Sequence, residues 1–358
     1  MPIAPRPDPA PLDLNVLFLA MGTQTPGSRF RVQQFFPHFR RLGVHPTLRT
    51  AYGDDYNVHS ARRYAPAYKL ASRLRRSAYA VTAGRYDVVY AHSTALRYTA
   101  LPERLSAALN RSLILDIDDA VYLGSTGQPN RWASGAFDAA VAAAAHVVVG
   151  NETLAERAGV PHKTTIIPTV IDTDRYTPAG TVSAGPFRLG WMGTSGNFPV
   201  LAGVVPAVEA FLASRPEARF RIVSNRPFAP LAGHPQVEEI PWSAERELDL
   251  LRSFTVGIMP LTDTAWNRGK CAFKLIQYMA VGVPVLGSAV GANREVVADG
   301  EVGYLVPTTD DWLDSFERIE GDDLVGMGLR ARSRAVSHYS IDSVLPTYCD
   351  LFRRVAAR

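Results

Sequence analysis

The chain has 358 residues, of which 47% are hydrophobic and 20% are charged, a balance typical of globular protein with room for two domains. Its 38 basic and 34 acidic residues leave a net charge of +4, which is small for the length and argues against a nucleic-acid partner. The two cysteines, Cys271 and Cys349, are far apart and lack metal-ligand spacing, so neither a zinc site nor a disulfide framework is expected.

The chain opens with a proline-rich stretch, residues 1–13, which we expect to be a disordered lead. From residue 14 to 172, short β-branched runs then alternate with longer helical ones. Alternation of this kind predicts a doubly wound, Rossmann-like sheet. Strands are expected at 15–20, 87–91, 113–117, 146–150 and 164–167, and helices at 30–42, 100–109, 133–145 and 152–158, the last capped by Asn151.

Residues 168–186 have the proline and glycine content of a linker, and the alternation then restarts. We therefore predict a second doubly wound domain over 173–339, so that the fold class is α/β with two Rossmann-like domains facing a central cleft. Ligands of such sheets bind at the carboxyl ends of the strands. Strands are expected at 187–192, 219–224, 256–260 and 285–288, and helices at 200–214, 245–253, 272–281 and 340–357.

The segment 268–297 is the most informative part of the sequence. It begins with Arg268, Gly269 and Lys270, and a helix is expected to start near Cys271. Free N–H groups and the positive end of the dipole make a helix N-terminus a phosphate site, and the two cations would reinforce it. The same residues also suit an ordinary helix–turn–strand unit with a solvated basic entry, and physical reasoning alone leaves both interpretations open.

The same segment resembles the donor-site signature of the glycosyltransferase group 1 (family 4) enzymes, in which an E-x7-E element ends in E-A-M-A-x-G-x-P-V before a glycine turn and a glutamate. Here residues 277–285 read QYMAVGVPV, followed by Gly291 and Glu295. The linker run 166–172 (IIPTVID), Gly193 and the run 299–306 (DGEVGYLV) follow the family in order and spacing. The resemblance covers nearly the whole chain.

This resemblance implies a GT-B fold and a retaining hexosyltransferase that uses a nucleotide-sugar donor without a metal or other cofactor. It also implies a C-terminal helix, 340–358, that crosses back to the N-terminal domain (14–172). The acceptor would be a glycan, a lipid or a small molecule. The expected location is cytoplasmic, with peripheral contact at the inner face of the membrane as a further option.

The sequence departs from the family pattern at two places. Gln277 and Gly269 replace the two glutamates of the E-x7-E element, and Thr194 and Ser195 stand where the family has an Arg/Lys pair. We therefore assign the neutralisation of the diphosphate to Lys270, as a catalytic residue, with Lys274 in a lesser role. The predicted donor-binding residues are Gly193, Thr194, Ser195, Arg268, Lys270, Lys274, Gln277 and Glu295.

The loops of the N-terminal domain are expected to hold the acceptor. The loop 21–29 contains Gly27 and Arg29, and Arg29 and Arg31 could meet a phosphate. The predicted acceptor-side residues are Gly27, Arg29, His92 and Asp119. Asp118 is the second predicted catalytic residue and would orient the acceptor hydroxyl or take its proton late. The alternatives are a structural histidine at 92 and an aspartate cluster that stabilises a turn.

Two other function classes stay open on sequence alone. The loss of both glutamates also suits a non-catalytic GT-B protein that binds a nucleotide sugar. The spacing of the motifs does not distinguish a sugar-nucleotide epimerase of the same fold from a glycosyltransferase. Donor binding without transfer would distinguish the first of these from an enzyme.

Overall fold

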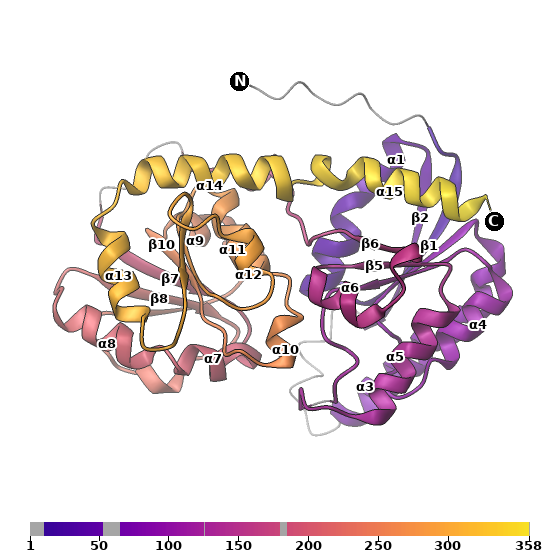
Figure 1. The fold of residues 1–358 in the computed structure, drawn as a ribbon, viewed down its shortest axis with the longest axis horizontal. Helices are drawn as coiled ribbons and strands as arrows, with labels where there is room; N and C mark the ends of the chain where they lie inside the picture. The colour runs from indigo at the N-terminus through magenta and orange to yellow at the C-terminus, as the bar shows by residue number, and fades with distance from the viewer. Residues whose placement is uncertain (1–10, 53–64, 125, 180–184, 358) are drawn as a thin grey trace. The chain divides into compact units, whose positions relative to one another are not determined.

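The computed structural model describes residues 11–52, 65–124, 126–179 and 185–357 (Figure 1), so that most of the predicted disordered lead lies outside the described residues. The chain forms two compact units. The first runs to Val170 and includes the C-terminal helix from Ile341, and the second is Ile171–Ser340. Each unit contains one six-stranded parallel sheet with helices on its faces.

The first sheet has the strand order β2-β1-β3-β4-β5-β6, with every neighbouring pair parallel. Strands β3, β4 and β5 are buried along their whole length, because helices cover both faces of the sheet. The strands are β1 (Leu14–Gly22), β2 (Val44–Tyr52), β3 (Val88–His92), β4 (Leu113–Ile117), β5 (His146–Val149) and β6 (Thr164–Ile166).

Helices of the first unit lie on both faces of its sheet (Figure 1), with α1 and α15 on one face and α3 to α6 on the other. Asn151 caps α6 as predicted, because its side chain accepts from the Leu154 N–H. The elements are η1 (Ser28–Val32), η2 (Gln33–Phe35), α1 (Phe36–Arg41), α3 (Ala65–Ala78), η3 (Tyr79–Arg85), α4 (Leu101–Leu109), α5 (Arg131–Ala143), α6 (Glu152–Ala158), η4 (Pro161–Lys163) and α15 (Ile341–Ala356).

Several features of the first unit differ from the sequence prediction, and one is helix α3, which was not expected. The single helix expected at 30–42 is instead a π-helical turn, a 3₁₀ turn and the short helix α1, which has Pro37 in its first turn. Strand β2 was missed because it lacks a long apolar run and contains Pro46. It pairs only with β1, and an edge strand tolerates a proline because one side of its backbone needs no partner.

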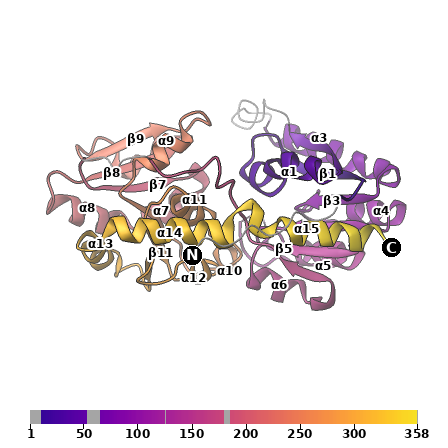
Figure 2. The same ribbon diagram turned by 90° about the horizontal axis from the view of Figure 1, so that it is seen from above.

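Helix α15 completes the core of the first unit although it comes from the other end of the chain. Tyr348 and Phe352 pack against the rings of Phe39 and Tyr90, and the Tyr90 and Tyr348 hydroxyls lie 3.2 Å apart. Figure 2 shows α15 running across the sheet in front of β3 and β5. Its apolar positions follow the helical period, so one face of it is buried.

The second sheet has the order β12-β11-β10-β7-β8-β9, again all parallel. Strands β9 and β12 at its two edges were not predicted from the sequence. The strands are β7 (Arg188–Met192), β8 (Arg219–Ser224), β9 (Val237–Pro241), β10 (Val256–Met259), β11 (Val285–Ser288) and β12 (Gly303–Val306).

In the second unit α13 packs on α8, and α14 packs on α11. The predicted helix 200–214 is broken into α7 and α8, because Pro206 has no N–H for the carbonyl one turn earlier. The elements are η5 (Ser195–Asn197), α7 (Phe198–Ala202), α8 (Val205–Ala213), η6 (Ala229–Leu231), α9 (Glu247–Arg252), α10 (Ala265–Arg268), α11 (Phe273–Ala280), α12 (Asn293–Val296), α13 (Trp312–Glu320) and α14 (Leu324–Tyr339).

Within the described ranges, no single helix has both the length and the apolar content needed to cross a bilayer. One bent pair, Ser195–Ala202 with Val205–Ala213, meets those two criteria only when its halves are taken together, across a bend of 68°.

Candidate functional site

Each sheet has one point at which the strand order reverses. In the first unit this point lies between β1 and β3, and in the second it lies between β7 and β10. A crevice forms outside the carboxyl ends of the strands at such a point, and it is where ligands of doubly wound sheets bind. The predicted site residues are therefore considered unit by unit, at these two strand ends.

In the second unit, Tyr278 fixes helix α11 against the strand ends. The Met192 N–H at the end of β7 donates to the Tyr278 hydroxyl at 3.0 Å. The ring fits because residue 257 on β10 is a glycine, since a Cβ there would lie 2.3 Å from the ring carbon Cδ2. Tyr278 is fully buried. The register of α11 on β7 and β10 is thus set by one hydroxyl and one glycine.

This register brings Lys274 to the end of β7. Helix α11 begins at Phe273, close to the predicted start, so Lys274 lies in its first turn whereas Lys270 precedes the helix. A Cβ built on Gly193 would lie 2.8 Å from Lys274 Cε and 2.8 Å from Trp191 Cζ2. The Lys274 ammonium lies 5.8 Å from the centroid of the buried Trp191 ring. Gly193 is therefore required for the lysine to lie beside the strand end.

The loop after Gly193 is held by backbone and side-chain hydrogen bonds. The Ser195 N–H donates to Asn225 Oδ1 at 2.8 Å, and Asn197 Nδ2 donates to Thr194 Oγ1 at 3.3 Å. Thr194 and Ser195 thus lie at the same strand end as Lys274. Asn225, which follows β8, was not identified from the sequence, although ligands were expected at the carboxyl ends of the strands.

The two basic residues before α11 have separate local contacts. The Lys270 ammonium lies 5.8 Å from the centroid of the Trp266 ring. The Arg268 guanidinium is exposed and donates twice to Asp263, at 2.6 and 2.9 Å. The Arg268 backbone lies against the glycine turn, since a Cβ on Gly291 would be 2.6 Å from its carbonyl oxygen.

The remaining two predicted donor residues lie on different helices. Gln277 is in α11, three residues after Lys274, and is mostly buried. Glu295 is in the short helix α12 and is exposed, and its backbone carbonyl accepts from Arg334. Gly193, Thr194, Ser195 and Lys274 therefore lie together at the end of β7, whereas Glu295 lies on a different helix, α12.

We expect Gly193→Ala to weaken donor binding by about tenfold or more, which is about 1.4 kcal/mol, because the new methyl group must displace Lys274 or Trp191. Gly196→Ala is a matched control in the same loop, since its Cβ would come no closer than 3.8 Å to Thr194 Oγ1. Isothermal titration with a nucleotide sugar measures both. Equal affinity of the two variants would mean that the ligand does not bind beside Gly193.

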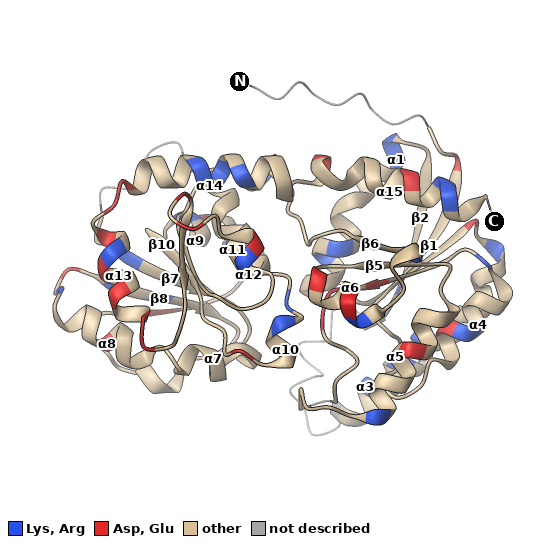
Figure 3. Cartoon of the chain, in the orientation of Figure 1, with Lys and Arg blue, Asp and Glu red and all other residues tan. Residues whose placement is uncertain are grey.

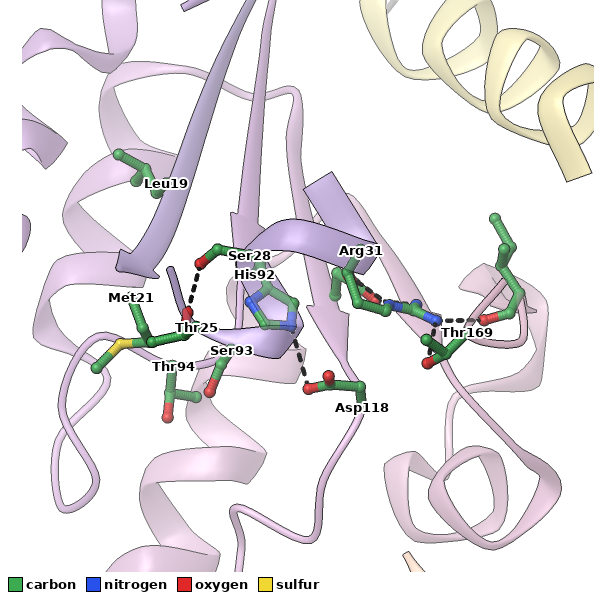
Figure 4. A network of polar contacts seen from close by, with 12 residues as sticks. Leu19, Met21, Thr25, Ser28, Arg31, His92, Ser93, Thr94, Asp118 and Thr169 are labelled. Atoms are coloured by element: carbon green, nitrogen blue, oxygen red, sulfur yellow. Dashed lines mark hydrogen bonds and ion pairs between the residues drawn. The ribbon is translucent and has the colours of Figure 1, made fainter. Parts of the chain in front are cut away.

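In the first unit, the loop between β1 and η1 is held by a small hydroxyl network, seen in Figure 4. The Thr25 hydroxyl bonds Ser28 Oγ at 2.9 Å, and the Gly22 N–H donates to the same oxygen at 3.3 Å. A Cβ on Gly27 would lie 2.5 Å from His92 Cε1. Gly27 therefore lets this loop approach the end of β3 closely.

His92 and Asp118 form an ion pair at the ends of β3 and β4 (Figure 4). His92 Nε2 lies 3.1 Å from Asp118 Oδ1, whereas the buried Nδ1 has no hydrogen-bond partner among the described residues. Burial opposes the charge of His92, but the Asp118 carboxylate outweighs it and raises the pKa of the imidazole. Burial acts against the charge of Asp118 as well, yet the imidazolium lowers the pKa of this carboxyl to about 2.

The pair has a defined pH window. A raised His92 pKa stabilises the fold below the unfolded value of 6.5, and this contribution is lost as the pH rises through the folded value. The lowered Asp118 pKa stabilises the fold above 3.8, and that contribution is lost as the pH falls through about 2.

We expect Asp118→Asn to lower the pKa of His92, because burial then acts unopposed by the carboxylate. The His92 ring-proton NMR titration, assigned with His92→Gln, measures this, and an unchanged midpoint would contradict the pairing.

Arg31 differs from its predicted role. It was expected to be able to meet a phosphate, but its side chain is buried and paired with Asp116 on β4, with Nε 3.0 Å from Asp116 Oδ2 and a second, shorter contact through Nη2. Nη1 donates to the Ile167 carbonyl at 2.7 Å. Burial opposes the charge, but Asp116 raises the pKa of Arg31. Arg31 and Asp116 thus join η1 to the sheet and are not available to a ligand.

The other two acceptor-side residues lie on the loops of the same strand ends. Arg29 is half-buried, with its guanidinium 4.8 Å from the Phe30 ring centroid. Asp119 is half-buried after Asp118, and its carbonyl accepts from the Val121 N–H at 2.7 Å. Over the described ranges, no three or more His, Cys, Asp or Glu side chains are grouped to hold a metal ion.

Comparison with known proteins identifies related sequences and folds. Residues 186–321 match the family model "Glycosyl transferases group 1". A D-inositol 3-phosphate glycosyltransferase of Streptomyces scabiei is 26% identical over 213 residues, which are 50% of this chain and 45% of the relative. The matched stretch thus spans less than half of that relative.

Two solved structures share the fold over nearly their full length. Sucrose-phosphate synthase from Thermosynechococcus elongatus is 16% identical, with a TM-score of 0.73, over 96% of this chain and 99% of that one. HepE of Anabaena, solved in complex with UDP and glucose, is 14% identical, with a TM-score of 0.67, over 95% and 99%. At these identities the likeness establishes the fold. The chain therefore has the GT-B fold of two Rossmann-like domains, and its second unit resembles the glycosyl transferases group 1 family over residues 186–321.

Proposed function

We propose that the chain is a retaining glycosyltransferase that moves a hexose from a nucleotide-sugar donor to an acceptor hydroxyl. The observation that carries the proposal is the position of Lys274, in the first turn of α11 and against Gly193 at the strand-order reversal of the second unit. A cation at the N-terminus of a helix is repelled by the positive end of the helix dipole. A bound diphosphate would neutralise both the lysine and the dipole and so make this position favourable.

Sugar transfer releases a nucleoside diphosphate, so negative charge grows on the phosphate oxygens as the glycosidic bond breaks. Lys274 would stabilise that charge, with Lys270 and Arg268 as further cations nearby in sequence. The Thr194 and Ser195 hydroxyls, with the backbone N–H groups of their loop, offer additional donors to the phosphates. No metal is assigned to this step, because the lysines already provide positive charge.

On the acceptor side, Asp118 is proposed to act through His92. A carboxyl with a pKa of about 2 is a weak base near neutrality, so Asp118 is poorly suited to remove a proton. It would instead orient the imidazolium, which can donate a hydrogen bond to an oxygen. Retention by front-face attack needs no protein base, since a donor phosphate oxygen can take the acceptor proton as the leaving group departs.

The decisive experiment is a panel of UDP-, GDP-, ADP- and dTDP-sugars tested for thermal stabilisation. A ligand at about 100 times its dissociation constant adds about 2.7 kcal/mol, which is readily detected. UDP-glucose is the first candidate, since HepE was solved with UDP and glucose. A panel in which no nucleotide sugar stabilises the protein would overturn the proposal.

A second measurement separates transfer from binding. With a stabilising donor and a mixture of glycan, inositol and lipid acceptors, the proposal expects a product whose anomeric proton in NMR shows the configuration of the donor. Inversion would refute retention while leaving glycosyl transfer intact. Donor binding without hydrolysis or transfer would instead favour a non-catalytic protein, for which the loss of both motif glutamates at Gly269 and Gln277 is the specific observation.

A further inference from the structure

Helices α3 and α4 of the first unit expose leucines and bury polar side chains, which is the reverse of the usual pattern of surface helices. On α3 the buried positions hold Ser72 and Arg76, whereas Leu70 and Leu74, one turn apart, are exposed. A surface helix normally turns its apolar stripe inward and its polar residues to water. Here the arrangement is reversed.

The same inversion occurs on α4. Its buried positions include Glu103 and Ser106, whereas its three leucines, spaced four residues apart, are exposed: Leu101, Leu105 and Leu109. The two helices are joined by contacts through η3 and are on the same face of the sheet (Figure 1). The next helix along that face, α5, adds an exposed tryptophan, Trp132.

The buried polar groups have structural partners, so the inversion is not an error of register. Arg76 Nη2 donates to the carbonyls of His92 and Ser93, both at 2.7 Å, and this ties α3 to the end of β3. Glu103 Oε1 accepts from the Ala95 N–H at 2.7 Å. Because the inner faces of α3 and α4 make these hydrogen bonds, the leucines of both helices face outward.

The charge around the leucines is almost entirely positive. Residues 66–111 contain eight Lys or Arg and two Asp or Glu, and one of the two acidic residues is the buried Glu103. Figure 3 shows basic positions on both α3 and α4. Seven of the eight cations are exposed or half-buried: Lys69, Arg73, Arg75, Arg85, Arg97, Arg104 and Arg111.

We propose that this leucine-and-cation face of α3 and α4 docks on a membrane surface that contains anionic lipids. The exposed leucines of both helices would enter the boundary of headgroups and acyl chains, while the long basic side chains would reach the phosphates. Each cation near an anionic surface adds attraction, which is screened by salt. A second copy of the chain on this face would bring like charges together, which is unfavourable. A nucleic acid would pair with the cations but would leave the leucines without apolar contacts.

The test is co-sedimentation with vesicles of phosphatidylcholine, alone or mixed with phosphatidylglycerol, at low and at physiological salt. The wild-type chain is expected to bind the anionic vesicles, to bind less at higher salt, and to stay free of the neutral ones. The Leu74→Glu/Leu101→Glu variant should partition at least about tenfold more weakly, because each glutamate removes an apolar anchor and is repelled by the lipid charge.

The matched control is Leu329→Glu/Val325→Glu on α14 of the second unit, since Leu329 and Leu101 are both 67% exposed. It should bind as the wild type does, and Arg85→Glu/Arg104→Glu should lose the preference for anionic vesicles. Circular dichroism and donor-induced thermal stabilisation report that each variant is folded.

Three results would overturn the proposal. These are no binding of the wild type at low salt, equal loss in the two leucine variants, or self-association that Leu74→Glu/Leu101→Glu abolishes, which would make the face a subunit interface. None of these outcomes depends on whether the chain transfers sugar.

Discussion

Lys274→Ala is expected to lower turnover by about 100-fold or more, about 2.7 kcal/mol of transition-state stabilisation, which is comparable to the loss of one preorganised electrostatic donor. The reason is the position of Lys274 in the first turn of α11, beside Gly193 and the Trp191 ring. The charge on the leaving diphosphate grows toward the transition state, so turnover should fall by more than the affinity for the donor.

Lys270→Ala is the informative comparison, because the sequence motif alone made Lys270 the principal cation. Since α11 begins at Phe273, Lys270 precedes the helix and lies over Trp266, and we expect its loss to cost about tenfold. Single-turnover kinetics with a saturating donor measures both variants. If Lys270→Ala loses turnover and Lys274→Ala keeps it, the phosphates bind ahead of the helix and the role of Lys274 is wrongly assigned.

Asp116→Asn is expected to destabilise the first unit by about 3–5 kcal/mol, because it leaves the buried Arg31 guanidinium without its counter-charge. Arg31 is 2% exposed and Asp116 is 0% exposed, so water cannot replace the lost carboxylate. Urea unfolding followed by tryptophan fluorescence and circular dichroism measures the change, provided that the transitions of the two units are separated.

Asp138→Asn provides the control for that experiment. Asp138 also pairs with an arginine, Arg157, at 2.7 Å, but its carboxylate is exposed. Exposed pairs of this kind contribute about 0–1 kcal/mol. Similar losses in Asp116→Asn and Asp138→Asn would show that burial of the Arg31 pair has no special importance.

The central strands were accessible from the sequence, whereas three of the edge strands, β2, β9 and β12, were not. Runs such as HVVVG at 146–150 are buried on both faces and read as strands by composition alone. The edge strands β2 and β9 carry a proline or several charged residues, because only part of each strand is buried, and composition does not mark such segments as strands. Two short helices, α7 and α8, were read as one because periodicity continues across the break at Pro206.

The sequence predicted candidate site residues at the ends of strands, but it did not predict which charged side chains pair with one another. Gly27 and Gly193 were predicted as site residues, and each lies against a specific side chain, that of His92 and that of Lys274. No local pattern could show that Arg31 and Asp116, 85 residues apart, neutralise each other, since that requires the register of η1 on β4. Arg31 therefore looked like a ligand-binding arginine until the fold placed it.

The position of helix α15 at the end of the chain affects when the first unit can fold during translation. Eight of the buried residues of the first unit's core belong to α15, so a ribosome that has released residues 1–170 has produced all six strands of that sheet but not the helix that covers Phe39 and Tyr90. The first unit must wait for the entire second unit to be translated before its core can close. A nascent or truncated chain lacking residues 341–358 would keep an aromatic surface open to water, where chaperones or aggregation would compete for it.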